Sequence, residues 1–475
     1  MSWGAVSLMG ILYWLYWIVA IVIMTRLMLR NNDSVKTLAW IMVFIFIPFL
    51  GLVLYFFFGR NTRKKRIVGK RFLSLINQHC TPGADARAKM ELSPGQQSLA
   101  TFFENASSAS LLPFDEAEVI SDSGIFAERL LEIVSAAENH IHLQFYIIED
   151  DAFGRRLRDA LVEKARLGVE VRLIYDSVGC WKVKRSFFDN MRRAGVYVEA
   201  FLEVYFPLLS NRVNYRNHRK IVVVDGKVGM VGGYNIADRY LHGIGGAAWR
   251  DTMLLLRGAG VRGLQASFVV DWYFVNRMPI SGERYFPRAD GAGKALVQVV
   301  TSNPVGDVRP IAAGYVKILS QAKDYVYLQT PYFMPDESFL QALKNAALSG
   351  VDVRLMIPEN SDSTIADYAS MSYLGTLLHS GVKVYLYCGG MLHSKSVVCD
   401  DSVSSIGSAN LDFRSFFYNF EVSALVYDKD VALKMKEDFI GDLQCCRQMM
   451  ANEYRRRPLL RRCAESFIKL FSPLL

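Results

Sequence analysis

The pattern of apolar and polar positions divides the chain into an apolar N-terminal part and a longer part with alternating periodicity. Residues 3–24 and 38–59 form two runs without a charged residue. As helices, runs of this length match the roughly 30 Å hydrocarbon thickness of a bilayer. The pattern therefore predicts a transmembrane hairpin with helices at about 3–24 and 38–59.

Two alternatives to the hairpin agree less well with the sequence. A cleaved signal peptide fits the first run poorly, because no positive charge precedes the run and no A-x-A cleavage site follows it. A pair of buried core helices is the other alternative. Aromatic residues that suit a bilayer better than a soluble core lie in both runs, at Trp14, Trp17, Trp40 and Tyr55.

Beyond residue 115, one order of elements occurs twice. An apolar strand-like segment, a helical stretch and two Gly-led strands follow each other in residues 141–203 and again in residues 325–387. Alternation of this kind predicts an α/β fold with a mixed or mainly parallel sheet. The two copies predict an internal duplication that forms two related lobes.

These patterns define four segments. We expect a transmembrane hairpin (1–60), a basic juxtamembrane connector (61–115), a first repeat (116–290) and a second repeat with a basic amphipathic C-terminus (291–475). The C-terminal run has two interpretations, a helix at the membrane interface or a terminal helix docked on the body. The apolar side chains that would enter the interface are Leu460, Phe467, Leu470 and Phe471.

The charge distribution favours a membrane surface over nucleic acid as the partner. The net charge is +9, and the excess of Lys and Arg lies within residues 1–71. A nucleic-acid-binding surface would spread basic charge over the folded body, whereas a basic collar beside apolar runs is typical of proteins at anionic membranes. More Lys and Arg follow the second run than link the two runs, which predicts a cytoplasmic body.

The most informative pattern is a motif that occurs once in each repeat. NHRKIVVVDGKVGMVGGYNIADRY (217–240) and LHSKSVVCDDSVSSIGSANLDFRS (392–415) align at one constant offset. In this register, His218, Lys220, Asp225, Gly232 and Asn235 match His393, Lys395, Asp400, Gly407 and Asn410. A single His-x-Lys on a strand is usually a surface pair, so the repetition in register is what indicates a functional site.

Strand geometry explains why His and Lys recur at this spacing. Side chains at i and i+2 of a strand share a face, so His218 and Lys220 point the same way, as do His393 and Lys395. A phosphodiester between both copies would meet two imidazoles for nucleophilic attack and proton donation. It would also meet two ammonium groups for its non-bridging oxygens.

The remaining motif residues have supporting roles. Asp225 and Asp400 complete the candidate catalytic set, but each ends an apolar strand, so we expect a structural role for both. The Gly-rich turns that follow let the backbone approach a ligand. Asn235 and Asn410 would add amide donors for the phosphate.

A metal site is the competing interpretation of paired histidines. Lysine is not a ligand of divalent metals, and no carboxylate lies at ligand spacing from the motif histidines. The seven cysteines are odd in number and include no CxxC pair, so neither a zinc site nor a disulfide framework is expected. We therefore predict a reaction without a metal or another cofactor.

The repeated H-x-K-x-x-x-x-D, followed by Gly-[Gly/Ser]-x-Asn, resembles the signature of the phospholipase D superfamily over roughly residues 120–450. The resemblance extends to bacterial cardiolipin synthases of that superfamily. It rests on the apolar N-terminal runs, RNHRK (216–220), WRD (249–251), TPYF (330–333), NFE (419–421) and the final FSPLL (471–475). The resemblance implies a duplicated phospholipase D-type fold whose two pseudo-twofold-related lobes share one active site.

The resemblance also implies a reaction and its roles. Members of the family act through a phosphatidyl-histidine intermediate, with one histidine as nucleophile and the other as general acid and base. The family's usual pattern assigns the first role to His218 and the second to His393. The implied reaction converts two molecules of phosphatidylglycerol, an anionic lipid with a free primary hydroxyl, into cardiolipin and glycerol.

A histidine that attacks through one nitrogen needs an acceptor for its other nitrogen. Asp251, which follows His218 in the WRD segment, and Glu421, which follows His393 in the NFE segment, are the candidates. Both lie in motifs that resemble the orienting carboxylates of the family. A solvated surface acid is the alternative for each.

Two other functions stay open from the sequence. A membrane-bound hydrolase of the same superfamily would let water resolve the intermediate, whereas a bilayer keeps lipid hydroxyls concentrated beside the site. A non-catalytic membrane scaffold would show decay of one motif, and both motifs are complete. We expect a multi-pass protein of the bacterial inner membrane, with the bilayer and phosphatidylglycerol as partners, no nucleic acid partner, and homo-oligomerisation left open.

Overall fold

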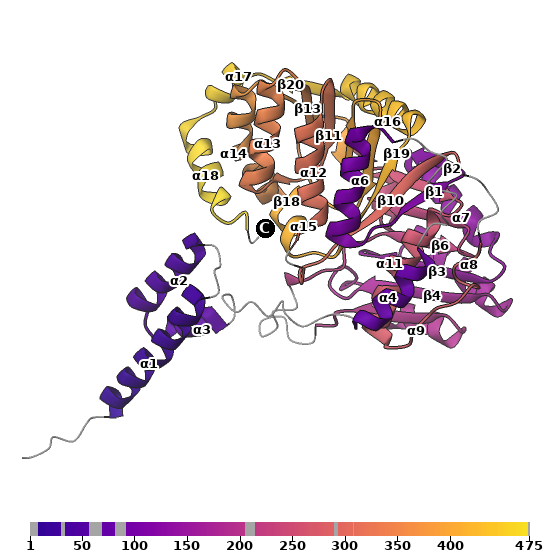
Figure 1. The fold of residues 1–475 in the computed structure, drawn as a ribbon, viewed down its shortest axis with the longest axis horizontal. Helices are drawn as coiled ribbons and strands as arrows, with labels where there is room; N and C mark the ends of the chain where they lie inside the picture. The colour runs from indigo at the N-terminus through magenta and orange to yellow at the C-terminus, as the bar shows by residue number, and fades with distance from the viewer. Residues whose placement is uncertain are drawn as a thin grey trace, which may run out of the picture. The chain divides into compact units, whose positions relative to one another are not determined.

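The structure is a computed structural model of the 475-residue chain. It describes residues 8–29, 34–56, 69–80, 92–204, 214–288, 293–306 and 308–473. The described residues form an N-terminal unit of apolar helices and a large α/β body, which are separate compact units (Figure 1).

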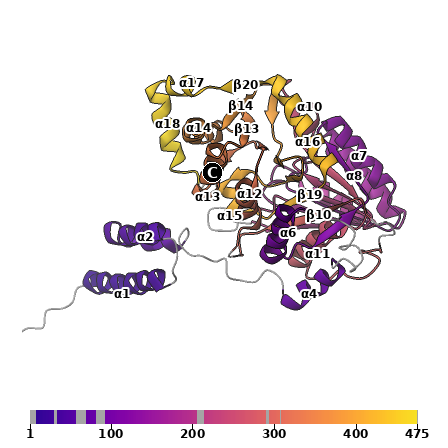
Figure 2. The ribbon, with the colours of Figure 1, turned by 45° about the horizontal axis from the view of Figure 1, so that its top comes forward.

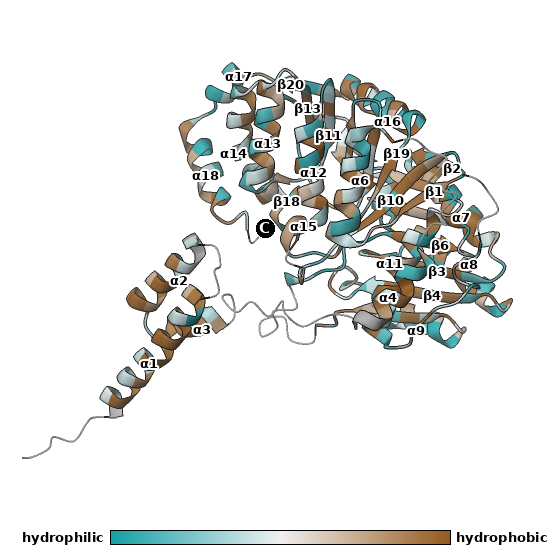
Figure 3. Ribbon diagram, viewed as in Figure 1, coloured by the Kyte–Doolittle hydropathy of each residue, from teal (hydrophilic) through white to brown (hydrophobic). Residues whose placement is uncertain are grey.

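The N-terminal unit contains α1 (Leu8–Leu29), α2 (Ser34–Phe46) and α3 (Leu50–Leu54). Most residues of α1 and α2 are hydrophobic, in contrast to the mixed hydropathy of the helices in the body (Figure 3). Within the described residues, one helix is long and apolar enough to cross a bilayer, at Gly10–Leu29. The apolar part of α2, at Thr37–Phe46, is shorter.

The expectation of one continuous helix over 38–59 is wrong for the described part of that run. α2 ends before Pro48, which has no N–H to donate to the carbonyl of Phe44. That carbonyl instead accepts a hydrogen bond from the hydroxyl of Tyr16 on α1. Phe49 then has a φ of 61°, which a right-handed helix does not contain, and α3 begins after it.

The other expectations for this region are tested only in part. The first helix extends to Leu29, beyond the expected end near residue 24, and it includes Arg26. Residues 3–7 of the first run, residues 57–59 of the second run and the basic segment 60–68 lie outside the described residues.

The body contains two large sheets, one for each repeat. The first has seven strands in the order β2-β9-β7-β6-β3-β4-β5. They are β2 (Glu116–Ile120), β3 (His140–Phe145), β4 (Glu170–Asp176), β5 (Tyr197–Phe201), β6 (Ile221–Val224), β7 (Val228–Gly232) and β9 (Met253–Arg257). The second has nine strands in the order β1-β10-β19-β17-β16-β11-β13-β14-β20. They are β1 (Leu111–Phe114), β10 (Ala295–Ser302), β11 (Tyr325–Gln329), β13 (Asp352–Pro358), β14 (Lys383–Tyr387), β16 (Ser396–Cys399), β17 (Val403–Gly407), β19 (Glu421–Tyr427) and β20 (Cys446–Met449).

The strand orders show the duplication directly. The series β9-β7-β6-β3-β4-β5 of the first sheet recurs as β19-β17-β16-β11-β13-β14 in the second. In each series the last three strands are parallel, and the others are antiparallel. The sheets are therefore mixed. Short turns join the antiparallel neighbours β6 and β7, and likewise β16 and β17, whereas parallel neighbours need a long crossover.

Helices cover the outer face of each sheet. The first sheet is covered by α7 (Ser123–Ser135), α8 (Ala152–Arg166) and α9 (Arg185–Arg193), and the second by α12 (Pro310–Gln321), α13 (Glu337–Leu348) and α14 (Thr364–His379). Figures 1 and 2 show the two groups of helices on opposite sides of the body. Side-chain caps fix the starts of several of these helices, for example Asp151 for α8 and Asp336 for α13.

The inner faces of the two sheets share one apolar core. Ile221 and Val231 of the first sheet belong to the same buried cluster as Val398 and Ile406 of the second. Two further helices lie in this layer, α11 (Val261–Asn276) and α16 (Lys429–Asp442). α11 packs on its own sheet and on β10 of the other repeat, and α16 packs on its own sheet and on β2. Each helix thus makes the equivalent contact with the other repeat, as a pseudo-twofold relation between the repeats requires.

Short elements complete the body. Two parallel strand pairs are β8 (Ala248–Arg250) with β15 (Gly390–Leu392) and β12 (Phe333–Met334) with β18 (Leu411–Asp412). The remaining helices are α4 (Lys70–His79), α6 (Pro94–Ser107), α10 (Asp238–His242), α15 (Phe413–Phe417), α17 (Ala451–Arg455), α18 (Leu459–Lys469) and the 3-10 turn Leu443–Cys445. Part of the expected connector thus joins the second repeat, since α6 packs on α12 and β1 pairs with β10.

Candidate active site

The motif histidines lie where the two repeats meet. The His and Lys of the first motif directly precede β6, and those of the second directly precede β16, which takes the equivalent place in the other sheet. The amide N–H of His218 donates to the carbonyl of Phe420 at 2.9 Å, and that of His393 donates to the carbonyl of Arg250 at 2.7 Å. The backbone of each histidine is therefore held by the other repeat.

Each imidazole is hydrogen-bonded to a carboxylate of the other repeat. Nδ1 of His218 lies 3.1 Å from both carboxylate oxygens of Glu421. Nδ1 of His393 lies 2.5 Å from Oδ2 of Asp251. The sequence singles out both carboxylates through their motifs. It does not reveal the exchange, because Asp251 follows His218 along the chain and Glu421 follows His393.

Both carboxylates are fully buried and accept further hydrogen bonds. Glu421 accepts from the hydroxyl of Ser408 at 2.5 Å and from the side-chain amide of Asn419 at 3.1 Å. Asp251 accepts from the backbone N–H of Thr252 at 2.7 Å. Because bonds to the ionised form favour ionisation, these donors fix the carboxylates as acceptors for the two imidazoles.

The two motif lysines are buried beside the histidines. Nζ of Lys220 donates to the carbonyl of His218 at 2.7 Å, and Nζ of Lys395 donates to the carbonyl of His393. Nζ of Lys395 also lies 3.9 Å from Oδ2 of Asp251. Each ammonium is thus tied to the backbone of its own motif and keeps further N–H donors, since an ammonium has three.

The environment keeps both imidazoles neutral in the free protein. Burial lowers the pKa of His218, aided by the charges of Lys220 and Lys395 and opposed by Glu421. Burial, aided by Lys395 and Lys220, lowers the pKa of His393 to about 4 against the opposing charge of Asp251. A neutral imidazole that donates Nδ1–H to a carboxylate has its lone pair on Nε2.

The pKa values of the lysines and carboxylates respond to charges of both repeats. Burial lowers the pKa of Lys395 to about 8, opposed by Asp251 and Glu421. Burial also lowers the pKa of Lys220 well below its ordinary value, opposed by Glu421 and aided by Lys395. Burial alone would raise the pKa of both carboxylates, but the lysines and histidines hold each below its ordinary value. Charges of both repeats therefore meet within interaction range.

The motif asparagines anchor loops around the histidines. Oδ1 of Asn235 accepts from the backbone N–H of Ile147 at 3.0 Å, and its Nδ2 donates to the hydroxyl of Tyr240 at 2.7 Å. Nδ2 of Asn410 donates to Asp412 at 3.1 Å. Oδ1 of Asn410 is buried without a hydrogen-bond partner among the described residues. Each Nδ2 has a second N–H, so the expected role as an amide donor to phosphate is compatible with these bonds.

Asp225 and Asp400, included in the candidate catalytic set, lie at the opposite ends of β6 and β16 from the histidines. The carboxylate of Asp225 accepts bonds from three successive backbone N–H groups at 138–140, at 2.7–2.9 Å. The carboxylate of Asp400 accepts the equivalent three bonds from 323–325, at 2.8–2.9 Å. Both residues have positive φ, of 54° and 49°. They hold the turn against the start of β3 or β11, away from the imidazoles.

Aromatic side chains that the sequence analysis does not single out surround the two imidazoles. The ring of Tyr146 lies 5.0 Å from that of His218 and 5.5 Å from Nζ of Lys220. The rings of Trp249 and Tyr240 lie 5.1 and 5.7 Å from that of His393. Trp249 belongs to the WRD segment, which is a signal for it, whereas Tyr146 and Tyr240 have no counterparts at matching positions in the second repeat.

The described residues contain no group of three or more His, Cys, Asp or Glu side chains arranged to hold a metal ion. The two histidines are each committed to a carboxylate through Nδ1, and their neighbours are lysines. The donor set therefore fits an anionic ester better than a divalent cation.

Comparison with known proteins assigns the family. The family model described as "Cardiolipin synthase, PLD-like domain" matches residues 130–256 and 315–443. The chain belongs to the cardiolipin synthase family of the phospholipase D superfamily. A second model, described as "Phospholipase_D-nuclease N-terminal", matches residues 14–60. The duplicated match coincides with the two repeats seen in the strand order.

Relatives of the family match almost the whole chain. The major cardiolipin synthase of Bacillus subtilis (strain 168) is 38% identical, over 99% of this chain and 100% of that protein. A cardiolipin synthase of Geobacillus kaustophilus is 39% identical, over 94% of this chain and 90% of that protein. The crystal structure of a phosphatidylserine synthase from Haemophilus influenzae superposes with a TM-score of 0.60 at 14% identity, covering 79% of this chain and 98% of that chain. The last similarity shows a shared fold.

Proposed function

We propose that the protein is a membrane phosphatidyltransferase that makes cardiolipin and glycerol from two molecules of phosphatidylglycerol. The observation that carries the proposal is the pair of crossed contacts, His218 with Glu421 and His393 with Asp251. Two oriented imidazoles and two buried ammonium groups are the set that a metal-independent phosphoryl transfer needs. The names of the full-length relatives supply the lipid product.

In the first step, Nε2 of His218 attacks the phosphorus of one phosphatidylglycerol while Glu421 accepts its Nδ1–H. The bond from phosphorus to the glycerol oxygen breaks, and His393 donates a proton to that oxygen, so that glycerol leaves. His393 has a low pKa in the free site, and the negative phosphate that enters beside it raises its proton affinity. The ammonium groups of Lys220 and Lys395 stabilise the non-bridging oxygens.

In the second step, the hydroxyl of another phosphatidylglycerol attacks the phosphatidyl-histidine. His393, now neutral, takes the proton of that hydroxyl, the bond between phosphorus and nitrogen breaks, and cardiolipin is released. Both protonation states of His393 are regenerated in turn, so one turnover consumes no net proton. Asp251 holds the imidazole in one tautomer throughout.

The second acceptor is a lipid because the site operates at a bilayer. The helix segment Gly10–Leu29 provides one span long enough to anchor the chain, and anchoring raises the effective concentration of lipid hydroxyls at the site. We propose a location in the bacterial cell membrane with the body on the cytoplasmic side, in agreement with the basic residues that follow the second apolar run.

A second contact with the bilayer is supported by α18. One side of α18 packs on α14, and the buried Glu465 there pairs with Arg457 and Arg461. The opposite side is apolar and open: Leu460, Phe467 and Leu470 are 86%, 62% and 74% exposed. Apolar side chains flanked by Arg and Lys suit the headgroup region of an anionic membrane. Both interpretations of the C-terminal run thus have support, on different faces of one helix.

The experiment that tests the proposal is turnover of pure phosphatidylglycerol vesicles by the purified full-length chain. Cardiolipin and glycerol in equal amounts support transfer. Phosphatidic acid with glycerol would support the hydrolase, and no turnover would support the scaffold. The variant His218→Ala serves as the control for contaminating activity, with circular dichroism to show that it remains folded.

A further inference from the structure

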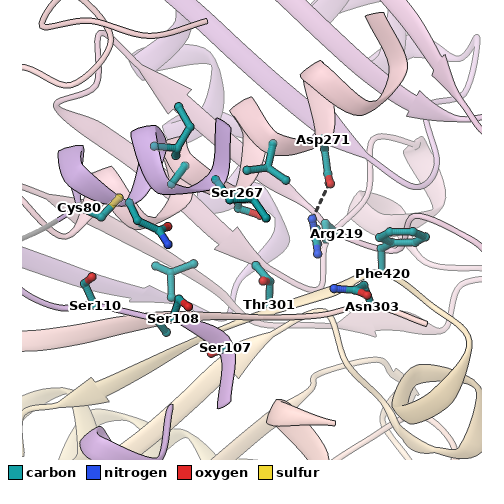
Figure 4. Close-up of a pocket in the computed structure, with 18 of the residues that line it drawn as sticks. Cys80, Ser107, Ser108, Ser110, Arg219, Ser267, Asp271, Thr301, Asn303 and Phe420 are labelled. Carbon is teal, nitrogen blue, oxygen red and sulfur yellow. Dashed lines mark hydrogen bonds and ion pairs between the residues drawn. The ribbon is translucent and has the colours of Figure 1, made fainter. Parts of the chain in front are cut away.

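A cavity of about 510 Å³ lies beside the segment that carries His218. It is lined by α4, by the loop after α6, by α11, and by β10 with the loop that follows it (Figure 4). Its volume falls within the ~300–1,000 Å³ typical of small-ligand sites. No step of the proposed reaction uses it.

The backbone of two paired segments separates this cavity from the catalytic groups. Residues alternate in direction along an extended segment, so Arg219 points away from the face that His218 and Lys220 share. By the same alternation, the side chain of Phe420 points away from the face that carries Glu421. Arg219 and Phe420 line the cavity, whereas none of the catalytic His, Lys or carboxylate side chains does. An occupant of the cavity is therefore not the phosphodiester under attack.

The lining has an apolar part and a hydroxyl-bearing part. Leu73 and Ile76 of α4, with Ala266 and Val270 of α11, supply much of the apolar wall. Hydroxyls come from the end of α6, from the loop that follows it and from β10, at Ser107, Ser108, Ser110 and Thr301. Figure 4 shows these hydroxyl residues together along one side. The cavity thus matches a molecule with one apolar and one hydroxyl-bearing side.

One buried hydroxyl in the cavity is unsatisfied. Ser267 of α11 is 6% exposed, and its Oγ has no hydrogen-bond partner in the described part of the chain. Ser267 lies beside the cavity in Figure 4. An unpaired buried hydroxyl costs free energy. Because the Oγ itself is buried, a rotation about χ1 would have to turn it toward the cavity before a ligand atom could bond to it and remove that cost.

The charges of the described lining residues cancel. Among the described residues that line it, Arg219 and Asp271 are the charged ones, and they pair at 2.7 Å. Arg219 also donates to the carbonyl oxygens of Glu421 and Ser302, at 3.1 and 3.2 Å. Because these bonds satisfy the guanidinium, the described lining residues provide no free cation for an anionic headgroup.

We propose that this cavity binds a neutral, single-chain amphiphile of the monoacylglycerol class. Its acyl chain lies against α4 and α11, and its hydroxyls bond to Ser267 and to the hydroxyl-bearing side of the cavity. The site is separate from the catalytic pocket, and its occupancy does not depend on the proposed transfer reaction.

Photolabelling tests this site in the full-length chain, reconstituted in phosphatidylcholine nanodiscs. The probe is a monoacylglycerol with a diazirine in its acyl chain, and mass spectrometry locates the adducts. We expect labelled peptides from α4 and α11, with labelling suppressed by excess unlabelled monooleoylglycerol. An equal excess of oleate, which has the same chain and a negative charge, should compete at least about fivefold less well.

Two variants of α11 and one control variant on α13 test whether labelling depends on the residues that line the cavity. Ala266→Phe fills the apolar part of the cavity and should lower labelling about tenfold, whereas Ala342→Phe, at another half-buried helical alanine on α13, should leave it unchanged. Ser267→Ala should lower labelling by the monoacylglycerol but not by a diazirine hydrocarbon of equal length. Thermal unfolding reports whether each variant is folded. Adducts only outside α4 and α11, labelling insensitive to both α11 variants, or equal competition by oleate would each overturn the proposal.

Discussion

Nδ1 of His218 is hydrogen-bonded to Glu421, which lies 203 residues further along the chain and belongs to the other repeat. Asp251 and His393 form the matching contact in the opposite sense, 142 residues apart. Neither repeat therefore contains a complete half-site with an oriented imidazole. Each lobe supplies the carboxylate that accepts a hydrogen bond from the other lobe's histidine, so the orientation of either imidazole depends on both lobes.

The first prediction concerns Glu421→Gln. A glutamine keeps the size of the side chain, but it removes the negative charge that accepts Nδ1–H and stabilises the imidazolium. We expect kcat for cardiolipin formation to fall about 10²- to 10⁴-fold with little change in KM. The control is Glu359→Gln, which removes a partly exposed carboxylate paired with Arg447. A loss of less than tenfold in Glu421→Gln would show that this carboxylate does not orient the nucleophile.

The crossed contacts mark the limit of what the sequence predicts. The spacing of His and Lys places both on one face of a strand, which is a local rule, and the repeat in register shows that two such faces exist. Which carboxylate meets which histidine depends on how the lobes dock. Nothing within the WRD or NFE segments encodes that choice.

The apolar N-terminal runs show a different limit. Composition alone predicts two similar helices, but Pro48 removes one backbone donor and Phe49 takes a positive φ, so the second run is interrupted. A proline within an apolar run is visible in the sequence and marks a position where a helix kinks or breaks. By contrast, the hydrogen bond from Tyr16 to the freed carbonyl of Phe44 is a tertiary contact, which no local pattern contains.

The second prediction identifies the nucleophile. A p-nitrophenyl ester of phosphatidic acid has a leaving group that needs no proton, so it bypasses the general acid in the first step. With this substrate, His393→Ala should release a stoichiometric burst of nitrophenol and accumulate a phosphatidyl adduct on His218. Mass spectrometry of the quenched protein locates the adduct. His218→Ala should give neither burst nor adduct, and an adduct on His393 in that variant would reverse the two roles.

The third prediction is an alkaline limit set by the lysines. Burial lowers the pKa of Lys395 to about 8, so the positive charge that it would present to the phosphate is lost as pH rises through that value. Because the pKa of Lys220 is also lowered by burial, it acts in the same direction. We therefore expect kcat/KM to fall above about pH 8, more than two units below the ordinary range of an ammonium group. A profile that stays flat to pH 10, with protein stability verified at each pH, would contradict this account.

The fourth prediction separates Asp225 from the chemistry. Asp225→Ala removes the acceptor of three backbone N–H groups and places alanine at a positive φ. We expect unfolding to become easier by about 1–3 kcal/mol and the thermal midpoint to fall, with kcat of the folded protein within about twofold of normal. Asp225→Asn is the control, since asparagine keeps an oxygen acceptor and tolerates positive φ. A large loss of kcat without loss of stability in Asp225→Ala would return this residue to the catalytic set.

The last prediction concerns the exposed face of α18. If Leu460, Phe467 and Leu470 enter the headgroup region, replacing all three by Glu removes apolar contact and adds repulsion from anionic lipid. We expect turnover in phosphatidylglycerol vesicles to fall about tenfold or more. Turnover in detergent mixed micelles, where the substrate reaches the site without a lamellar surface, should stay near normal. Leu348→Glu on α13 is the matched control, because Leu348 is also 70% exposed at the end of a helix. Equal losses in vesicles and in micelles would mean that the substitutions disturb the packing of α18 on α14, and the apolar face would then have no part in membrane contact.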